Sequence, residues 1–142
     1  MIILDTNVIS EAMRATPDAS VASWLHSQPP FELATTTINV AELKFGIARL
    51  SPGPRRADLE ARFDDLVQRG LLRRVLGFDA AAGDAFAELA ASRQRSGRPL
   101  VGFDGLIAAI AVSRGLAIAT RDVRGFEDCG IEVVNPWEPV ST

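Results

Sequence analysis

The sequence predicts an α/β protein in which helices cover both faces of a central, mainly parallel β-sheet. Short apolar runs typical of buried strands alternate with longer segments that have the apolar spacing of helices. Because parallel neighbouring strands need crossover connections, this alternation favours a three-layer α/β/α sandwich. The chain has 142 residues and shows no repeat, linker or low-complexity tract, so we expect a single domain over residues 1–142.

The first half of the chain alternates short strands with amphipathic helices. A buried strand is expected where the apolar run after Met1 meets a polar cluster, and Pro29-Pro30 separates the next helix from the second strand. Asp18 is the expected N-cap of the second helix. The strands are expected at 2–4 and 31–35, and the helices at 7–14, 18–27, 38–50 and around 59–70.

The second half follows the same alternation. A short strand near 73–78 precedes Asp79, the expected cap of a long alanine-rich helix, and a loop at 96–99 follows this helix. The segment 104–114 is apolar nearly all round, which is typical of a buried helix, and Gly115 stands where a terminating glycine is favoured. The last strands are expected at 116–120 and 131–134.

Composition excludes several classes of protein. The chain is 47% hydrophobic and 23% charged with a formal net charge of −3, which is not the pattern of a disordered chain. The longest apolar stretch, 105–120, is too short for a membrane span and contains Arg114, and the N-terminus lacks the basic region of a signal peptide. Since Cys129 is the only cysteine, we expect a reducing compartment and a soluble cytoplasmic protein with no membrane association.

Four carboxylates stand at positions suited to a shared site. Asp5 and Asp122 follow two of the expected strands, whose carboxyl ends form the edge where open parallel sheets bind ligands. Asp104 opens the buried helix, and Glu42 lies within a helix without a cation three or four residues after it. The alternatives are helix caps for Asp5 and Asp104, a turn for Asp122, and the rim of the core for Glu42.

Convergence of these carboxylates would demand a cation. Each close pair of like charges repels by about 4 kcal/mol at an effective dielectric constant near 20. Oxygen donors without nearby histidine or cysteine suit Mg²⁺ or Mn²⁺ better than zinc, and such an ion activates water toward phosphodiesters. Three polar residues are expected to orient the ligands or bound waters: Thr6, Asn7 and Thr120. Four arginines are candidate contacts to substrate phosphates, the alternative for the first three being a solvated helix end: Arg93, Arg95, Arg98 and Arg121.

In their order and spacing, these motifs resemble a PIN domain over essentially the whole chain, and more closely the VapC-type (FitB-like) toxins of bacterial toxin–antitoxin pairs. The motifs are Leu4-Asp5-Thr6-Asn7, Val40-Ala41-Glu42-Leu43 with Gly46, Asp104 before Ile107-Ala108-Ala109, Thr120-Arg121-Asp122 with Phe126, and Asn135-Pro136-Trp137. The resemblance implies that Asp5, Glu42, Asp104 and Asp122 are the catalytic, metal-binding residues and that Thr120 is the hydroxyl position. Many relatives have asparagine in place of Asp122, and many have an acidic residue where this chain has Gly125.

The implied function is that of a Mg²⁺- or Mn²⁺-dependent ribonuclease toxin that cleaves RNA through attack of metal-activated water on the phosphodiester. The implied partners are a small DNA-binding antitoxin of the VapB or FitA type and a second copy of the chain. One alternative is a housekeeping PIN-domain nuclease without an antitoxin. Another is a phosphatase of the haloacid-dehalogenase type, which needs a second aspartate two residues after Asp5, where this chain has Asn7.

Other residues are interpreted as structural. His26, the only histidine, is expected at the surface, and Trp24 and Trp137 are expected to pack. The apolar faces of the first two helices have two interpretations: they complete the core, or they form part of a surface for a partner. The residues concerned are Val8, Ile9, Met13, Val21 and Leu25.

Overall fold

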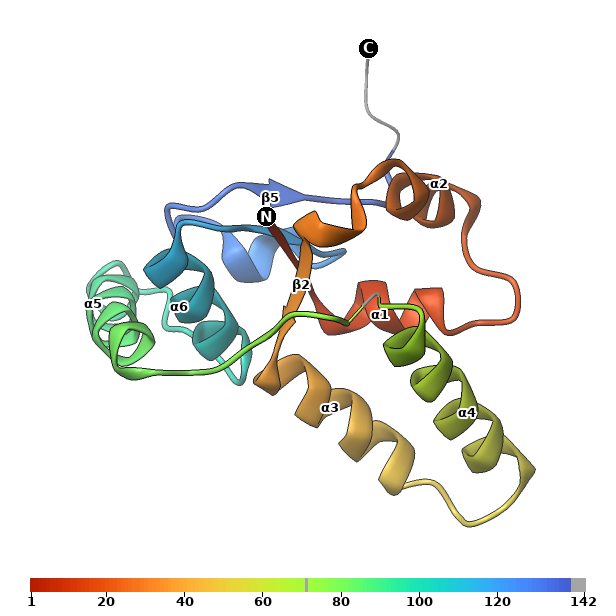
Figure 1. Ribbon diagram of the computed structural model, residues 1–142. Coiled ribbons are helices and arrows are strands. Elements are labelled where there is room, and N and C mark those ends of the chain that lie inside the picture. The colour runs from red at the N-terminus through yellow and green to blue at the C-terminus, as the bar shows by residue number, and fades with distance from the viewer. Residues whose placement is uncertain (71, 139–142) are drawn as a thin grey trace.

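The computed structural model describes residues 1–70 and 72–138 and contains a five-stranded parallel sheet (Figure 1). The strands are β1 (Ile2–Leu4), β2 (Leu33–Thr36), β3 (Val75–Leu76), β4 (Ala117–Ala119) and β5 (Val133–Val134). They lie in the order β3-β2-β1-β4-β5, and every neighbouring pair is parallel. The predicted α/β class with a mainly parallel sheet is therefore confirmed.

Six α-helices and two short 3₁₀ helices connect the strands within these ranges. The helices on the first half of the chain are α1 (Thr6–Ala12), α2 (Ala19–Ser27), α3 (Thr37–Ala48) and α4 (Pro54–Gln68). Those on the second half are α5 (Ala80–Arg95) and α6 (Asp104–Arg114), and the 3₁₀ helices are η1 (Pro30–Glu32) and η2 (Val123–Phe126). In the described residues, no helix has the length and apolar character needed to span a membrane.

Two apolar clusters, one on each face of the sheet, make the molecule three-layered. Adjacent strand residues point to opposite faces, so Leu4 belongs to the cluster covered by α1–α4 and Ile3 to the cluster covered by α6. Figure 1 shows α5 and α6 on one side of the strands and the helices of the first half on the other. The side chains on the first helices mainly complete the core, since Val8, Ile9 and Val21 are fully buried.

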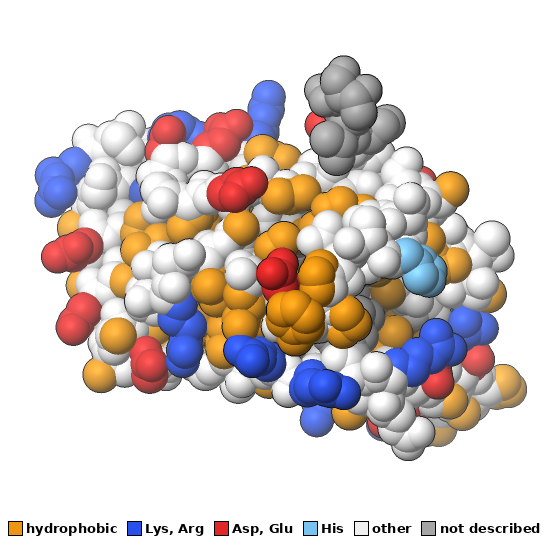
Figure 2. Space-filling view, turned by 45° about the horizontal axis from the view of Figure 1, so that its top comes forward, with side chains coloured by type: hydrophobic (Ala, Val, Ile, Leu, Met, Phe, Trp, Pro, Cys, Tyr) orange, Lys and Arg blue, Asp and Glu red, His pale blue; other side chains and the backbone are white. Residues whose placement is uncertain are grey.

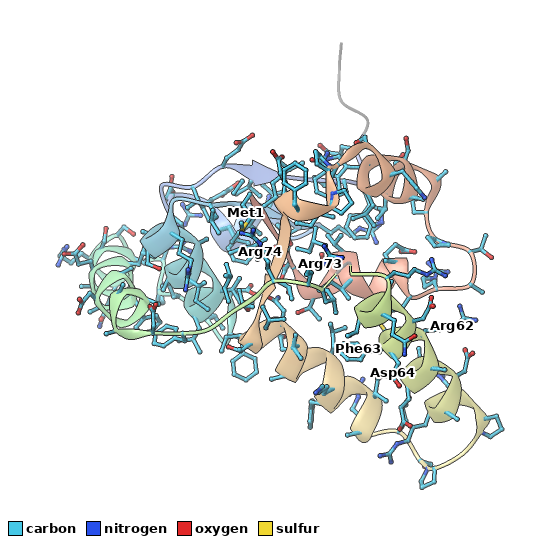
Figure 3. All side chains as sticks on the ribbon, viewed as in Figure 1. Met1, Arg62, Phe63, Asp64, Arg73 and Arg74 are labelled. Atoms are coloured by element: carbon cyan, nitrogen blue, oxygen red, sulfur yellow. The ribbon has the colours of Figure 1, made fainter. Side chains whose placement is uncertain are left out.

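Helix boundaries follow the predicted signals closely. Asp18 and Asp79 cap α2 and α5 through side-chain hydrogen bonds to backbone N–H groups, and α6 ends at Gly115 in the left-handed conformation (φ +65°). On α4, the labelled Phe63 points toward α3 (Figure 3), where the Lys44 ammonium lies 6.0 Å from its ring centroid. β1 spans the predicted residues 2–4, whereas the other strands are shorter than predicted. Phe31 lies in η1 and not in β2, and Phe78 follows β3 outside the ladder.

Some large apolar side chains remain at the surface. Phe31, Phe45, Val101 and Phe103 are each more than half exposed. In Figure 2, hydrophobic side chains gather in the middle of the face shown, with basic side chains along its lower edge. The surface of the chain thus retains apolar area that its own core does not use.

The direction of the chain across the sheet reverses between β1 and β4. From β1 the chain moves outward through β2 to β3, and it then returns to add β4 and β5 on the other side. Ligands of open parallel sheets bind at such a reversal, in the crevice beyond the carboxyl ends of the strands. This topology places Asp5 and Thr120, which follow β1 and β4, next to one another.

Candidate active site

An open pocket of about 570 Å³ lies beyond the carboxyl ends of β1 and β4. All four carboxylates singled out from the sequence line it, together with two of the three predicted orienting residues. The predicted residues among its lining are Asp5, Thr6, Asn7, Glu42, Asp104, Arg121 and Asp122. Five separate stretches of chain, among them the middle of α3 at Glu42, therefore meet at one place.

Asp5 is the most firmly held of the carboxylates. Its side chain is 5% exposed, and one oxygen accepts hydrogen bonds from the Thr6 backbone N–H (2.9 Å) and the Asn39 amide (3.0 Å). The other oxygen accepts from the Thr120 hydroxyl at 2.7 Å. Asp5 is thus the N-cap of α1, as the structural alternative required, and at the same time a member of the pocket.

Asn39 is a positioning residue that the sequence interpretation missed. Its fully buried amide donates to Asp5 and to the Thr6 hydroxyl (3.0 Å), and its oxygen accepts from Thr36 at 2.6 Å. The Thr6 hydroxyl donates in turn to Glu42 at 3.0 Å. The sequence did contain a signal for a buried polar residue here. Asn39 shares the buried stripe of α3 with Leu43 and Ile47 at spacings of four residues.

A second hydrogen-bonded group connects β4 to the start of α1. The Asn7 amide donates to the Thr120 hydroxyl (3.3 Å), and the Asn7 oxygen accepts from the Arg121 backbone N–H (3.2 Å). Thr120 also accepts from the Asp122 backbone N–H at 3.0 Å. Asp122 caps η2 by accepting from Gly125, so it is both the predicted turn residue and a pocket residue.

Asp104 and Asp122 approach each other around Gly125. Asp104 is the first residue of α6, whose N-cap is Phe103, so Asp104 is not the cap that the alternative proposed. A Cβ atom on Gly125 would lie 2.8 Å from an Asp104 carboxylate oxygen and 3.0 Å from one of Asp122. Position 125 in this chain therefore has no space for a side chain unless these carboxylates move.

We expect Gly125→Ala to lower activity by displacing the two carboxylates that face it. The methyl group would force Asp104 or Asp122 away from the pocket, and small displacements of active groups reduce rates by about 10²-fold. The rate of substrate cleavage by the purified variant measures the loss of activity, and thermal melting shows whether the variant remains folded. Gly46→Ala is the matched control, since a Cβ there meets nothing within 4 Å. Equal activity of the two variants would contradict this account of position 125.

Burial and mutual repulsion set the electrostatics of the pocket. Burial, followed by the charges of Asp5, Asp122 and Glu42, raises the pKa of Asp104 to about 6. Burial also raises the pKa of Glu42, which the Thr6 hydrogen bond lowers and the charge of Asp5 raises. Both shifts mean that the pocket holds more negative charge than its surroundings stabilise.

The donor chemistry of the pocket fits a hard divalent cation. Its predicted ligands are carboxylates, and a cation between them would relieve the repulsion that raises the pKa of Asp104. Within residues 1–70 and 72–138, however, no three acidic, histidine or cysteine side chains already stand close enough to enclose an ion. The carboxylates would have to turn toward one another on binding.

Three of the four arginines proposed as phosphate contacts lie outside this pocket. Arg93 corrects the prediction most clearly, because it is 9% exposed and donates to the backbone carbonyls of Arg98 and Glu127, each at 2.8 Å. Its guanidinium therefore holds the loop after α5 against the segment after η2. Arg98 pairs with Glu127 and Asp128, and Arg95 is exposed on the last turn of α5.

Trp137 has a role at the pocket that sequence reasoning did not assign. It packs partly against the core, as predicted, but it also lines the pocket. The guanidinium carbon of Arg121 lies 5.0 Å from the centroid of its ring. Arg14 pairs with Glu11 at 3.1 Å, and both of these residues also line the pocket.

Comparison with known proteins places this geometry in context. The PIN domain family matches residues 2–131. The chain is 45% identical to VapC ribonuclease Y4jK of Sinorhizobium fredii, covering 98% of this chain and 99% of that protein. It is 36% identical to toxin FitB of Neisseria gonorrhoeae, covering 96% and 99% of the two chains. A solved structure of FitAB bound to a DNA fragment matches with a TM-score of 0.89 at 34% identity, covering 98% and 97% of the chains.

Proposed function

The chain belongs to the PIN domain family, and from this membership we propose that it is the ribonuclease toxin of a toxin–antitoxin pair. The observation that carries the proposal is the meeting of four carboxylates in one pocket at the switch point of a parallel sheet. Relatives that match nearly the full chain are a ribonuclease and a toxin by name. The four proposed catalytic and metal-binding residues are Asp5, Glu42, Asp104 and Asp122.

PIN-domain nucleases depend on divalent metal ions, and we propose Mg²⁺ or Mn²⁺ for this chain because its donors are carboxylate oxygens. When bound, such an ion lowers the pKa of water and neutralises charge on a phosphodiester. Hydrogen bonds within the chain orient the carboxylates that would hold this ion. Asp5, fixed by three hydrogen bonds, is the ligand with the least freedom to move, and Glu42 is oriented by Thr6.

The polar neighbours position these carboxylates. Asn39 holds Asp5 and Thr6, while Asn7 holds Thr120, which in turn orients Asp5 and the backbone of Asp122. Because carboxylates of a metal site need partners that fix their direction, loss of this network should weaken metal binding even where every carboxylate remains.

The purified chain should cleave single-stranded RNA in Mg²⁺ or Mn²⁺ and stop when EDTA is added. The readout is a labelled RNA resolved on a denaturing gel, with p-nitrophenyl phosphate as the alternative substrate. Hydrolysis of the phosphate ester without RNA cleavage would support the phosphatase alternative instead. RNA cleavage that continues at the same rate in excess EDTA would exclude the proposed metal dependence.

We propose a small DNA-binding antitoxin of the VapB or FitA type as the partner, together with a second copy of the chain. FitB-like structures occur as complexes of toxin and antitoxin, one of them on DNA. The negative pocket would attract an arginine or lysine of the antitoxin, which would pair with the carboxylates in place of a metal ion. The exposed apolar side chains leave area for protein contacts. We place this activity in the cytoplasm, where its RNA substrate is made.

A further inference from the structure

The pocket contains one arginine that is not paired with a carboxylate among the described residues. Its two lining cations are Arg14, which forms an ion pair with Glu11, and Arg121, for which the described part of the chain offers no ion pair. Arg121 instead lies over the ring of Trp137, with 5.0 Å between its guanidinium carbon and the ring centroid. An exposed cation beside several carboxylates is thus held on an aromatic surface.

The structure explains how this arrangement is fixed. The Arg121 backbone N–H donates to Asn7 at 3.2 Å, which anchors the start of its side chain beside α1. The Trp137 backbone N–H donates to the side-chain oxygen of Asn135 at 3.0 Å, and its ring packs against the core. Both members of the pair therefore rise from restrained backbone at the wall of the pocket.

The negative charge of the pocket opposes the binding of a phosphodiester, and the pair formed by Arg121 and Trp137 offers it a cation. A phosphodiester entering a pocket lined by four carboxylates and Glu11 is repelled, and a metal ion on the carboxylates offsets only part of that charge. A guanidinium held over an aromatic ring by a cation–π contact keeps N–H groups available to a phosphate. Its planar fork can donate two hydrogen bonds to one phosphate group.

We propose that Arg121, held by Trp137, is the phosphate-binding residue that positions the RNA strand over the carboxylates, with Trp137 as its positioning residue. The inference rests on the proposed ribonuclease function and adds to it the element that holds the substrate backbone. Because the contact is to phosphate, it contributes to binding of every RNA sequence and makes binding sensitive to salt.

Single-turnover cleavage of a fluorescein-labelled single-stranded RNA in Mg²⁺ tests the proposal, with enzyme concentration and KCl varied. Arg121→Ala should raise the half-saturating enzyme concentration by roughly tenfold or more, the scale of a lost charge-assisted hydrogen bond, with a smaller change in maximal rate. The slope of log affinity against log salt should fall in magnitude by about 0.7, the value for one phosphate contact on a single strand. Arg55→Ala, on the exposed start of α4, is the charge-matched control and should behave as wild type.

Two further variants test separate parts of the proposal. One separates the paired hydrogen bonds of Arg121 from its charge, and the other separates RNA binding from the stability of the fold. Arg121→Lys should retain the salt slope but lose several-fold in affinity, since lysine cannot donate the paired hydrogen bonds. Trp137→Phe keeps an aromatic ring in the core and should weaken RNA binding by a few-fold. It should not lower the melting temperature enough to explain that loss of binding. Cleavage by the wild-type protein with unchanged affinity and salt slope in Arg121→Ala would overturn this inference alone. Absence of cleavage by wild type would instead overturn the proposed function.

Discussion

The Asp104→Asn variant should cleave RNA about 10³-fold more slowly than the wild-type protein and yet unfold less readily without metal. Loss of one ligand carboxylate removes several kcal/mol of transition-state stabilisation that a bound cation supplies, and each 1.36 kcal/mol is a factor of ten in rate. Gel-based cleavage assays at saturating Mg²⁺ measure the first effect. Asp84→Asn, on α5 and outside the pocket, is the matched control. Wild-type activity in Asp104→Asn would remove Asp104 from the site.

The gain in stability follows from the sign of the pKa shift. Because the folded state raises the pKa of Asp104 to about 6, the charged carboxylate lowers the free energy of unfolding above that pH. This penalty decreases as the pH falls from 6 and vanishes below the ordinary value of 3.8. Asp104 is only partly buried, so screening reduces the gain in Asp104→Asn to about 1–2 kcal/mol at pH 7.5. Urea denaturation in EDTA at pH 7.5 and pH 4 should show a much larger gain at the higher pH.

Induced expression of the wild-type chain should arrest bacterial growth, the largest effect expected in vivo. Cleavage of cellular RNA by an uninhibited toxin would stop protein synthesis, and we expect colony counts to fall by at least an order of magnitude. The Asp104→Asn variant should permit normal growth at equal soluble expression. Co-expression of the product of a small neighbouring reading frame should restore growth to cells that contain the wild-type chain.

The growth experiment also separates two PIN-domain functions. Normal growth with abundant, folded wild-type chain would favour the housekeeping nuclease over the toxin. Arrest by both the wild type and Asp104→Asn would mean that the effect does not come from the nuclease site, and it would contradict the proposed mechanism of toxicity.

Local signals predicted much of the fold because they act within a few residues. The N-caps Asp18 and Asp79 and the terminating Gly115 fixed helix boundaries that the structure confirms. Most strand lengths were overestimated, as at β3, where two residues form the ladder although a strand was expected over 73–78. Ladder length depends on the partner strand, which a local apolar pattern does not contain.

The site was predictable where a residue's place followed from topology. Asp5 and Asp122 follow strands that end at the same edge, and the structure brings them into one pocket. Arg93 was misinterpreted because its acceptors, the carbonyls of Arg98 and Glu127, lie on a loop and on a segment 34 residues away. The contact between Arg121 and Trp137 likewise joins two segments whose meeting only the folded chain defines.

The central claim, that these carboxylates hold the divalent cation on which RNA cleavage depends, is tested most directly by measuring bound Mn²⁺ and RNA cleavage in the same samples. Electron paramagnetic resonance counts free Mn²⁺ while cleavage is followed across the titration. We predict that activity rises in parallel with Mn²⁺ bound to the wild-type chain and that Asp5→Asn loses both, whereas Arg55→Ala retains both. Cleavage without bound Mn²⁺, or undiminished binding and cleavage in Asp5→Asn, would contradict the claim.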